Sequence, residues 1–153
     1  MSDTSSFNEL RKVLENAATQ AAISAGVAEV LHIEGYRFNQ PKDALWVHFD
    51  YSTGDTFASA LGQGDVEGTP DRAKFNRTVG YVEFSILYPE NSAKAAPTII
   101  ADALRKRFSL KKWKVADIGH VTIAAMGNRP VPGAPKGFHR ILCDAVLDFH
   151  HLD

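Results

Sequence analysis

Histidine is the residue type in this sequence that offers the most chemistry, because imidazole binds metals and exchanges protons near neutral pH. The six histidines are His32, His48, His120, His139, His150 and His151. They lack the helical i, i+4 spacing of a metalloprotease pair, and the lone Cys143 has no second cysteine with which to form a zinc-binding motif. Adjacent strand residues point to opposite faces, so His150 and His151 are not expected to hold one metal ion together. We interpret them as a solvated terminal pair.

Nucleophile and phosphate-binding motifs are also missing from the sequence. There is no Gly-x-Ser-x-Gly elbow and no Gly-rich loop ending in Lys-Ser or Lys-Thr, and Gly62-Gln-Gly64 is interpreted as a turn. Cys143 lies in an apolar run, which is typical of an inert buried thiol. The sequence therefore predicts no catalytic residue, no metal and no cofactor, and we do not expect an enzyme.

A run of cations is the strongest charge feature of the chain. It consists of Arg105, Lys106, Arg107, Lys111, Lys112 and Lys114. One interpretation is a solvated helix end, where cations complement the negative end of the helix dipole. The other is a docking patch for an acidic partner surface or for passing DNA, with Trp113 as an apolar anchor.

Length and composition narrow the class of protein. The 153 residues, 44 % of them hydrophobic, are enough for one domain with a real core, which we place at residues 1–153. The 17 Lys and Arg residues nearly balance the 18 Asp and Glu residues, which does not favour extensive binding to nucleic acid or to an anionic membrane. The polar N-terminus and the absence of a long apolar run predict no signal peptide and no membrane span.

Two helices are predicted from apolar residues at helical spacing. The first covers Phe7–Ala25, with Ser6 and Glu9 as a capping box and Gly26 as its end. Its predicted apolar stripe is Leu10, Val13, Leu14, Ala17, Ala21 and Ile23. The second begins near Pro97, and its predicted stripe is Ile99, Ile100, Ala103, Leu104 and Phe108.

The remaining elements are predicted strands. They are a weak extended stretch within Val27–Asn39, a strand over Ala44–Tyr51, a short strand at Phe57–Leu61 inside a long excursion over Ser52–Arg77, and strands over Thr78–Tyr88, Trp113–Met126 and Phe138–His150. The Gly/Pro-rich segment Gly127–Gly137 is expected to be irregular. The order α-β-β-β-α-β-β predicts an α+β fold in which two helices pack on a mostly antiparallel sheet.

Aromatic residues fall on the strand faces that should point away from the helices. They are Trp46, Tyr81 and Phe57. One interpretation is a second small core beneath the long loops. The other is a subunit interface, where Trp and Tyr are enriched.

The chain resembles the tail terminator, or tail-completion, proteins of long-tailed bacteriophages and prophages. The resemblance extends from about Phe7 to Phe149. It rests on the N-terminal helix, Tyr36-Arg-Phe-Asn-Gln-Pro41 leading into Leu45-Trp46-Val47, the small-residue loop at Leu61-Gly62, Arg77-Thr-Val-Gly80, Ile86-Leu-Tyr-Pro89 and Ile99-Ile-Ala-Asp102-Ala-Leu-Arg-Lys-Arg-Phe108. The order and spacing of these segments carry the resemblance, rather than any single motif.

The resemblance implies a structural virion protein that assembles in the host cytoplasm into a ring, commonly a hexamer. Such a ring caps the head-proximal end of the tail tube, stops tube polymerisation and offers a surface for head–tail joining. Its implied partners are copies of itself, which can be monomers in solution and form the ring in the virion, the major tail tube protein and a neck protein. DNA passes through the ring without sequence-specific binding. From their sheet positions we expect Trp46, Tyr81 and Glu83 at subunit contacts. Residues expected to dock the tube or neck are Phe57, Arg72, Lys74, Arg77, Arg129, Lys111, Lys112 and Trp113.

Two alternatives stay open at the level of sequence. A neighbouring head–tail connector protein can have an α+β core of similar size. A small enzyme or ligand-binding domain needs a pocket with convergent polar groups, for which His48, Asp50 and Glu83 are only isolated candidates.

Overall fold

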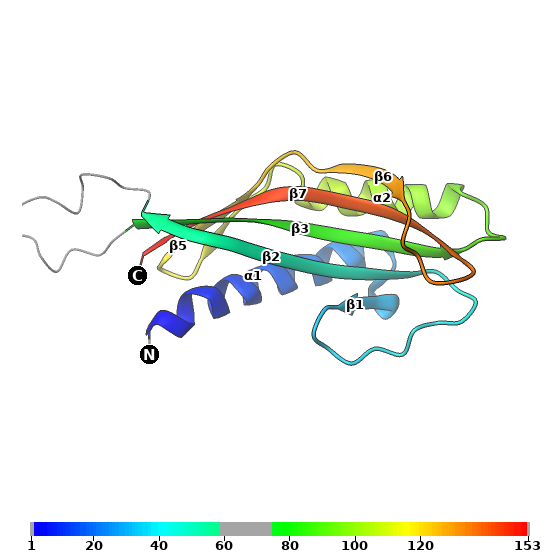
Figure 1. The fold of residues 1–153 in the computed structure, drawn as a ribbon, viewed down its shortest axis with the longest axis horizontal. Helices are drawn as coiled ribbons and strands as arrows, with labels where there is room; N and C mark the ends of the chain where they lie inside the picture. The colour runs from blue at the N-terminus through cyan, green and yellow to red at the C-terminus, as the bar shows by residue number, and fades with distance from the viewer. Residues whose placement is uncertain (1, 59–74, 153) are drawn as a thin grey trace, which may run out of the picture.

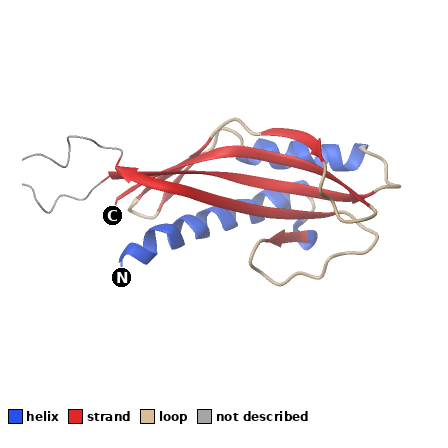
Figure 2. Ribbon diagram, in the orientation of Figure 1, coloured by secondary structure: helices blue, strands red, loops and turns tan. Residues whose placement is uncertain are grey.

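The computed structural model describes residues 2–58 and 75–152. Two helices and a mostly antiparallel, curled sheet form an α+β fold, which confirms the predicted class (Figure 1). The long strands run the length of the molecule with the helices beside them, as the colouring by secondary structure also shows (Figure 2).

Helix α1 spans Ser2–Ala25 and ends at Gly26, whose φ of 77° is readily adopted by glycine. The predicted capping box is wrong, because the helix begins before Ser6 and this residue is buried inside it. The buried stripe is Leu10, Leu14, Ala18, Ala21 and Ala22. Ile23, which we expected to face the core, is 55 % exposed.

Helix α2 spans Ala95–Phe108, and Pro97 lies in its first turn as predicted. Its buried residues are Pro97, Ala101, Leu104 and Phe108. Ile99 is 67 % exposed, so its predicted core position is wrong. The last turn carries Arg105, Lys106 and Arg107, where cations complement the helix dipole.

Seven strands make up the sheet within the described residues, in the order β1-β2-β3-β7-β5-β4, with β6 paired to β7. Their bounds are β1 Leu31–Ile33, β2 Trp46–Ala58, β3 Phe75–Pro89, β4 Lys112–Val115, β5 Gly119–Ile123, β6 Gly127–Val131 and β7 Phe138–Leu152, and a short 3-10 helix, η1, covers Ala28–Val30. The pairing of β1 with β2 is parallel and the other pairings are antiparallel.

Three strand predictions need correction. The single strand predicted over Trp113–Met126 is a hairpin of two shorter strands, β4 and β5. Strand β2 continues past Tyr51 to Ala58, so this part of the predicted excursion is paired sheet rather than loop, and residues 59–61 of the expected short strand lie outside the described residues. Residues Gly127–Val131 form β6 rather than an irregular loop, with Pro130 tolerated on a short strand that has one described neighbour.

The main core lies between the helices and one face of the sheet. Leu14 of α1, Phe108 of α2 and Phe84 of β3 are fully buried in the same cluster. The rings of Phe49, Phe84 and Phe108 lie 5.0 to 5.8 Å apart, a spacing typical of favourable aromatic packing. Both helices therefore cover the same face of the sheet, and the opposite face is described below.

No helix among the described residues has the length and apolarity required to cross a membrane.

Candidate assembly surfaces

The sheet face opposite α1 and α2, here called the outer face, is defined by strand register. Residues paired across antiparallel strands share a face, so the pairs Tyr81–Val146 and Glu83–Asp144 lie together. The intervening residue Val82 points to the buried core. In the described residues no helix packs over this part of the outer face.

An apolar row crosses the middle of the outer face. Tyr81 of β3 is 44 % exposed and its register partner Val146 of β7 is 54 % exposed. The row continues through backbone hydrogen bonds, in which the Ala124 N–H donates to the Val146 carbonyl at 3.0 Å and the Leu110 N–H donates to the Ala124 carbonyl at 3.3 Å. Leu110 is 74 % exposed and has a φ of 59°. Contiguous exposed apolar groups of this kind mark interaction surfaces more often than isolated ones do.

A row of carboxylates lies beside the apolar row. Register places Asp50, Glu83 and Asp144 side by side on β2, β3 and β7, and we call them the acidic row. Arg140 reaches Glu83 at 3.5 Å and Arg129 reaches Asp144 at 2.9 Å. Burial raises the pKa of Glu83, with Arg140 opposing that shift.

Asp50 differs from its two neighbours in the acidic row. Its carboxylate accepts a hydrogen bond from the backbone N–H of Tyr51 at 2.8 Å, and among the described residues it has no ion-pair partner. Among the described residues, Asp50 is therefore the carboxylate of the row whose charge is least compensated.

The opposite end of the outer face is richer in basic groups. Arg77 donates two hydrogen bonds of 2.8 Å to Asp148, a bidentate pair that lowers the pKa of Asp148. His120 stacks on His150 with ring centroids 5.2 Å apart. Burial lowers the pKa of His120, and the nearby Lys112 adds to this effect.

Trp46 lies on a part of the outer face that loops of the same chain cover. It is 8 % exposed and clusters with Leu87 and Phe138, beneath Phe38 and Ala134 from the connecting loops. This confirms the second-core interpretation for Trp46. Its role in subunit contacts stays a prediction that the burial does not support. Tyr81 lies on the open part of the face, whereas the side chain of Glu83 is 19 % exposed and lies between Tyr81 and the covered end.

A basic groove lies between α1, the end of α2 and β4. Its volume is about 440 Å³, and its cationic lining residues are Arg107, Lys111 and Lys114. Trp113 lines the groove and packs edge-on against Phe108 at 5.1 Å, so its ring is partly committed to the core. Arg107 donates to the Ser24 hydroxyl of α1. The groove carries no carboxylate in its lining.

The other predicted docking residues are dispersed. Arg129 lies beside the acidic row and Arg77 at the basic end, while Lys112 is exposed on the edge strand β4. Arg72 and Lys74 lie outside the described residues, as does the side chain of Phe57. The structure thus brings Lys111 and Trp113 together but does not join them to Arg129 or Arg77.

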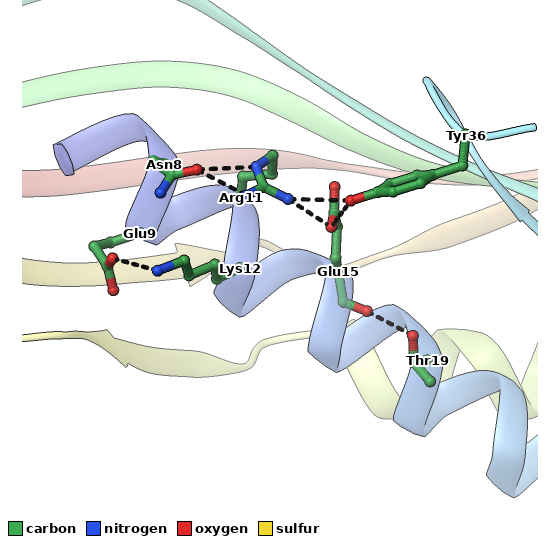
Figure 3. Close-up of polar contacts among 7 residues, drawn as sticks. All are labelled: Asn8, Glu9, Arg11, Lys12, Glu15, Thr19 and Tyr36. Carbon is green, nitrogen blue, oxygen red and sulfur yellow. Dashed lines mark hydrogen bonds and ion pairs between the residues drawn. The ribbon is translucent and has the colours of Figure 1, made fainter. Parts of the chain in front are cut away.

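A polar cluster ties α1 to the segment after β1 (Figure 3). Tyr36 donates to Glu15 at 2.8 Å, and Arg11 donates to Glu15 at 2.9 Å and to Tyr36 at 3.1 Å. The bond to Glu15 raises the pKa of Tyr36. Of this cluster only the i, i+4 spacing of Arg11 and Glu15 is visible in the sequence.

The histidines and Cys143 offer little chemistry where they lie. His151 is 1 % exposed and contacts Thr78 at 3.1 Å, so the predicted solvated pair is wrong for this residue. Burial raises the pKa of Cys143 to about 12. The described ranges contain no group of three or more His, Cys, Asp or Glu side chains arranged to hold a metal ion.

Comparison with known proteins adds information about the fold. No protein-family model matches the chain, and no curated protein does. Among solved structures, a chain without a descriptive name aligns with 94 % of this chain and 95 % of its own, at a TM-score of 0.63 and 14 % sequence identity. At that identity the likeness shows a shared fold alone.

Proposed function

We propose that the chain is a tail terminator of a long-tailed phage or prophage. In this role it assembles into a ring, commonly hexameric in the family it resembles, at the head-proximal end of the tail tube. The ring ends tube polymerisation and offers a surface to the neck protein of the filled head. DNA passes through the ring without being read.

The observation that supports this proposal best is the one-sided covering of the sheet. Both helices pack on one face, while Tyr81 and Val146 stay exposed on the other. A closed ring needs two different surfaces on every subunit, because each copy meets one neighbour through one surface and the next neighbour through the other. An open sheet face and a helix face with its own groove provide two such surfaces.

We assign contact with the tube and the neck to exposed cations at the margins of the sheet. Lys112 and Arg129 are exposed at the margins of the sheet. Rim charges of this kind act mainly on the rate and specificity of association. We propose them as docking residues for the major tail tube protein or the neck protein.

Electron microscopy of particles made without this protein tests the proposal. Loss of a terminator gives overlong tail tubes, because nothing stops polymerisation. Tails of normal length detached from heads identify a head–tail connector instead. Normal, infectious particles overturn both assignments, and restoring the wild-type gene is the control that links any defect to this chain.

A further inference from the structure

The acidic row and the basic groove lie on opposite sides of the molecule and carry opposite charge. The row offers Asp50, Glu83 and Asp144 on the outer face. The groove offers Arg107 and Lys111 on the helix side, and its lining also includes Lys114 of the edge strand β4, which pairs with Asp117 at 3.9 Å. Arg140 and Arg129 offset part of the row, which leaves Asp50 as its least compensated charge.

Apolar groups accompany the charges on both sides. On the outer face the apolar row lies next to the acidic row. On the helix side Ile23 and Ile99 are more than half exposed, and Trp113 lines the groove. Each side therefore has the mix of apolar and charged groups that specific interfaces show.

One way of stacking two outer faces on each other is unfavourable. A twofold axis along the strands that superposes the apolar rows places the acidic row on itself. A twofold axis along the apolar row instead brings the acidic row towards the basic end of the other copy, where Arg77 pairs with Asp148, and the Lys111→Glu variant below separates this arrangement from a joint that uses the groove. Like charges set against each other across an interface cost free energy.

We infer that the outer face of one copy packs against the helix layer of the next copy, with Asp50 and Glu83 facing the basic groove of Arg107, Lys111 and Lys114. This head-to-tail joint uses two different surfaces, and it gives a closed ring when the rotation from one copy to the next closes. It rests on the proposed function for its biological purpose, although the joint itself is a property of the isolated chain.

Charge reversal tests the joint through the self-association constant, measured by sedimentation velocity on the full chain. Asp50→Lys and Lys111→Glu should each weaken association at least about tenfold, the range expected for close interfacial charge pairs. An equimolar mixture of the two variants should associate as the wild type does. In that mixture the two variants alternate around the assembly. At every second joint the two substituted residues face each other with opposite charges, and at the other joints the two native residues do.

Matched controls separate this joint from general charge effects. Asp43→Lys and Lys106→Glu make the same reversals at exposed positions outside the row and the groove, and they should leave association unchanged. Circular dichroism confirms that every variant is folded.

Three results overturn the joint. The first is a wild-type chain that stays monomeric up to about 1 mM, a concentration at which a complex with a millimolar dissociation constant is half formed. The second is a Lys111→Glu variant that associates as the wild type does, which indicates sheet-to-sheet stacking. The third is a mixture of the two variants that fails to recover association. Overlong tails in the deletion experiment would leave the proposed function standing in each case, so the two failures are distinguishable.

Discussion

Replacing Trp46 distinguishes a core residue from an interface residue. The indole packs within 5.4 Å of the Phe38 ring and shares a buried cluster with Leu87 and Phe138. Truncating a buried Trp to Ala removes that packing and leaves a cavity, which typically lowers the free energy of unfolding by about 3–5 kcal/mol. We therefore expect Trp46→Ala to destabilise the monomer by about this amount.

Trp46→Phe is the informative companion variant. The Trp46 Nε1 is buried and has no hydrogen-bond partner among the described residues. A buried unsatisfied donor costs about 1–3 kcal/mol, which a phenyl ring avoids. That gain offsets most of the packing lost with the smaller ring, so Trp46→Phe should lie within about 1 kcal/mol of the wild type.

Urea unfolding followed by far-UV circular dichroism measures both variants, and sedimentation velocity on the folded protein reports assembly. The core interpretation predicts a large loss of stability for Trp46→Ala, with unchanged association of the molecules that stay folded. A loss below about 1 kcal/mol, or equal losses for Ala and Phe, would refute the reasoning. Weakened association of a fully stable Trp46→Ala variant would return this residue to the subunit interface.

Two further variants test the sheet itself. Gly80→Ala should lower the free energy of unfolding in urea by about 1–3 kcal/mol, because the added Cβ would overlap the Ser52 carbonyl oxygen. Gly127→Ala is the matched control and should be near neutral, because nothing lies within 4 Å of its added Cβ. Equal effects of the two substitutions would contradict this prediction. Asp148→Asn should be less stable than the wild type near pH 6. Because Arg77 lowers the Asp148 pKa below its ordinary 3.8, the carboxylate stabilises the fold above about pH 4, and that contribution disappears as the pH falls through the folded pKa. A stability gap that stays constant down to pH 2 would contradict the ion pair.

Alternation along the strands was enough to predict the fold class. Phe84 and Ile86 on β3 alternate with Glu83 and Ser85, and this period of two identifies the strand and its buried face. Strand β2 beyond Tyr51 escaped prediction because its residues are polar and Gly-containing. They are held by backbone pairing to β3 rather than by burial of their side chains.

The candidate surfaces depended on information that a single sequence does not contain. Tyr81 and Glu83 were predicted as surface groups from their own strand, but their neighbours Val146 and Asp144 come from β7 and follow only from the register. Trp46 was placed on the correct face, yet Phe38 and Ala134 cover it from loops whose paths have no sequence signature. Ile23 and Ile99 were assigned to the core because helical spacing cannot tell which edge of an apolar stripe is covered.

The central place of β7 has a consequence for biosynthesis. This strand follows every other strand along the chain, yet it lies between β3 and β5 and also pairs with β6. Until the ribosome releases it, the β2–β3 hairpin and the β4–β5 hairpin are two separate halves, and neither Val146 nor Asp144 is in place. A nascent chain therefore lacks the β7 part of the outer face, with Val146 and Asp144, until this last strand has joined the two hairpins.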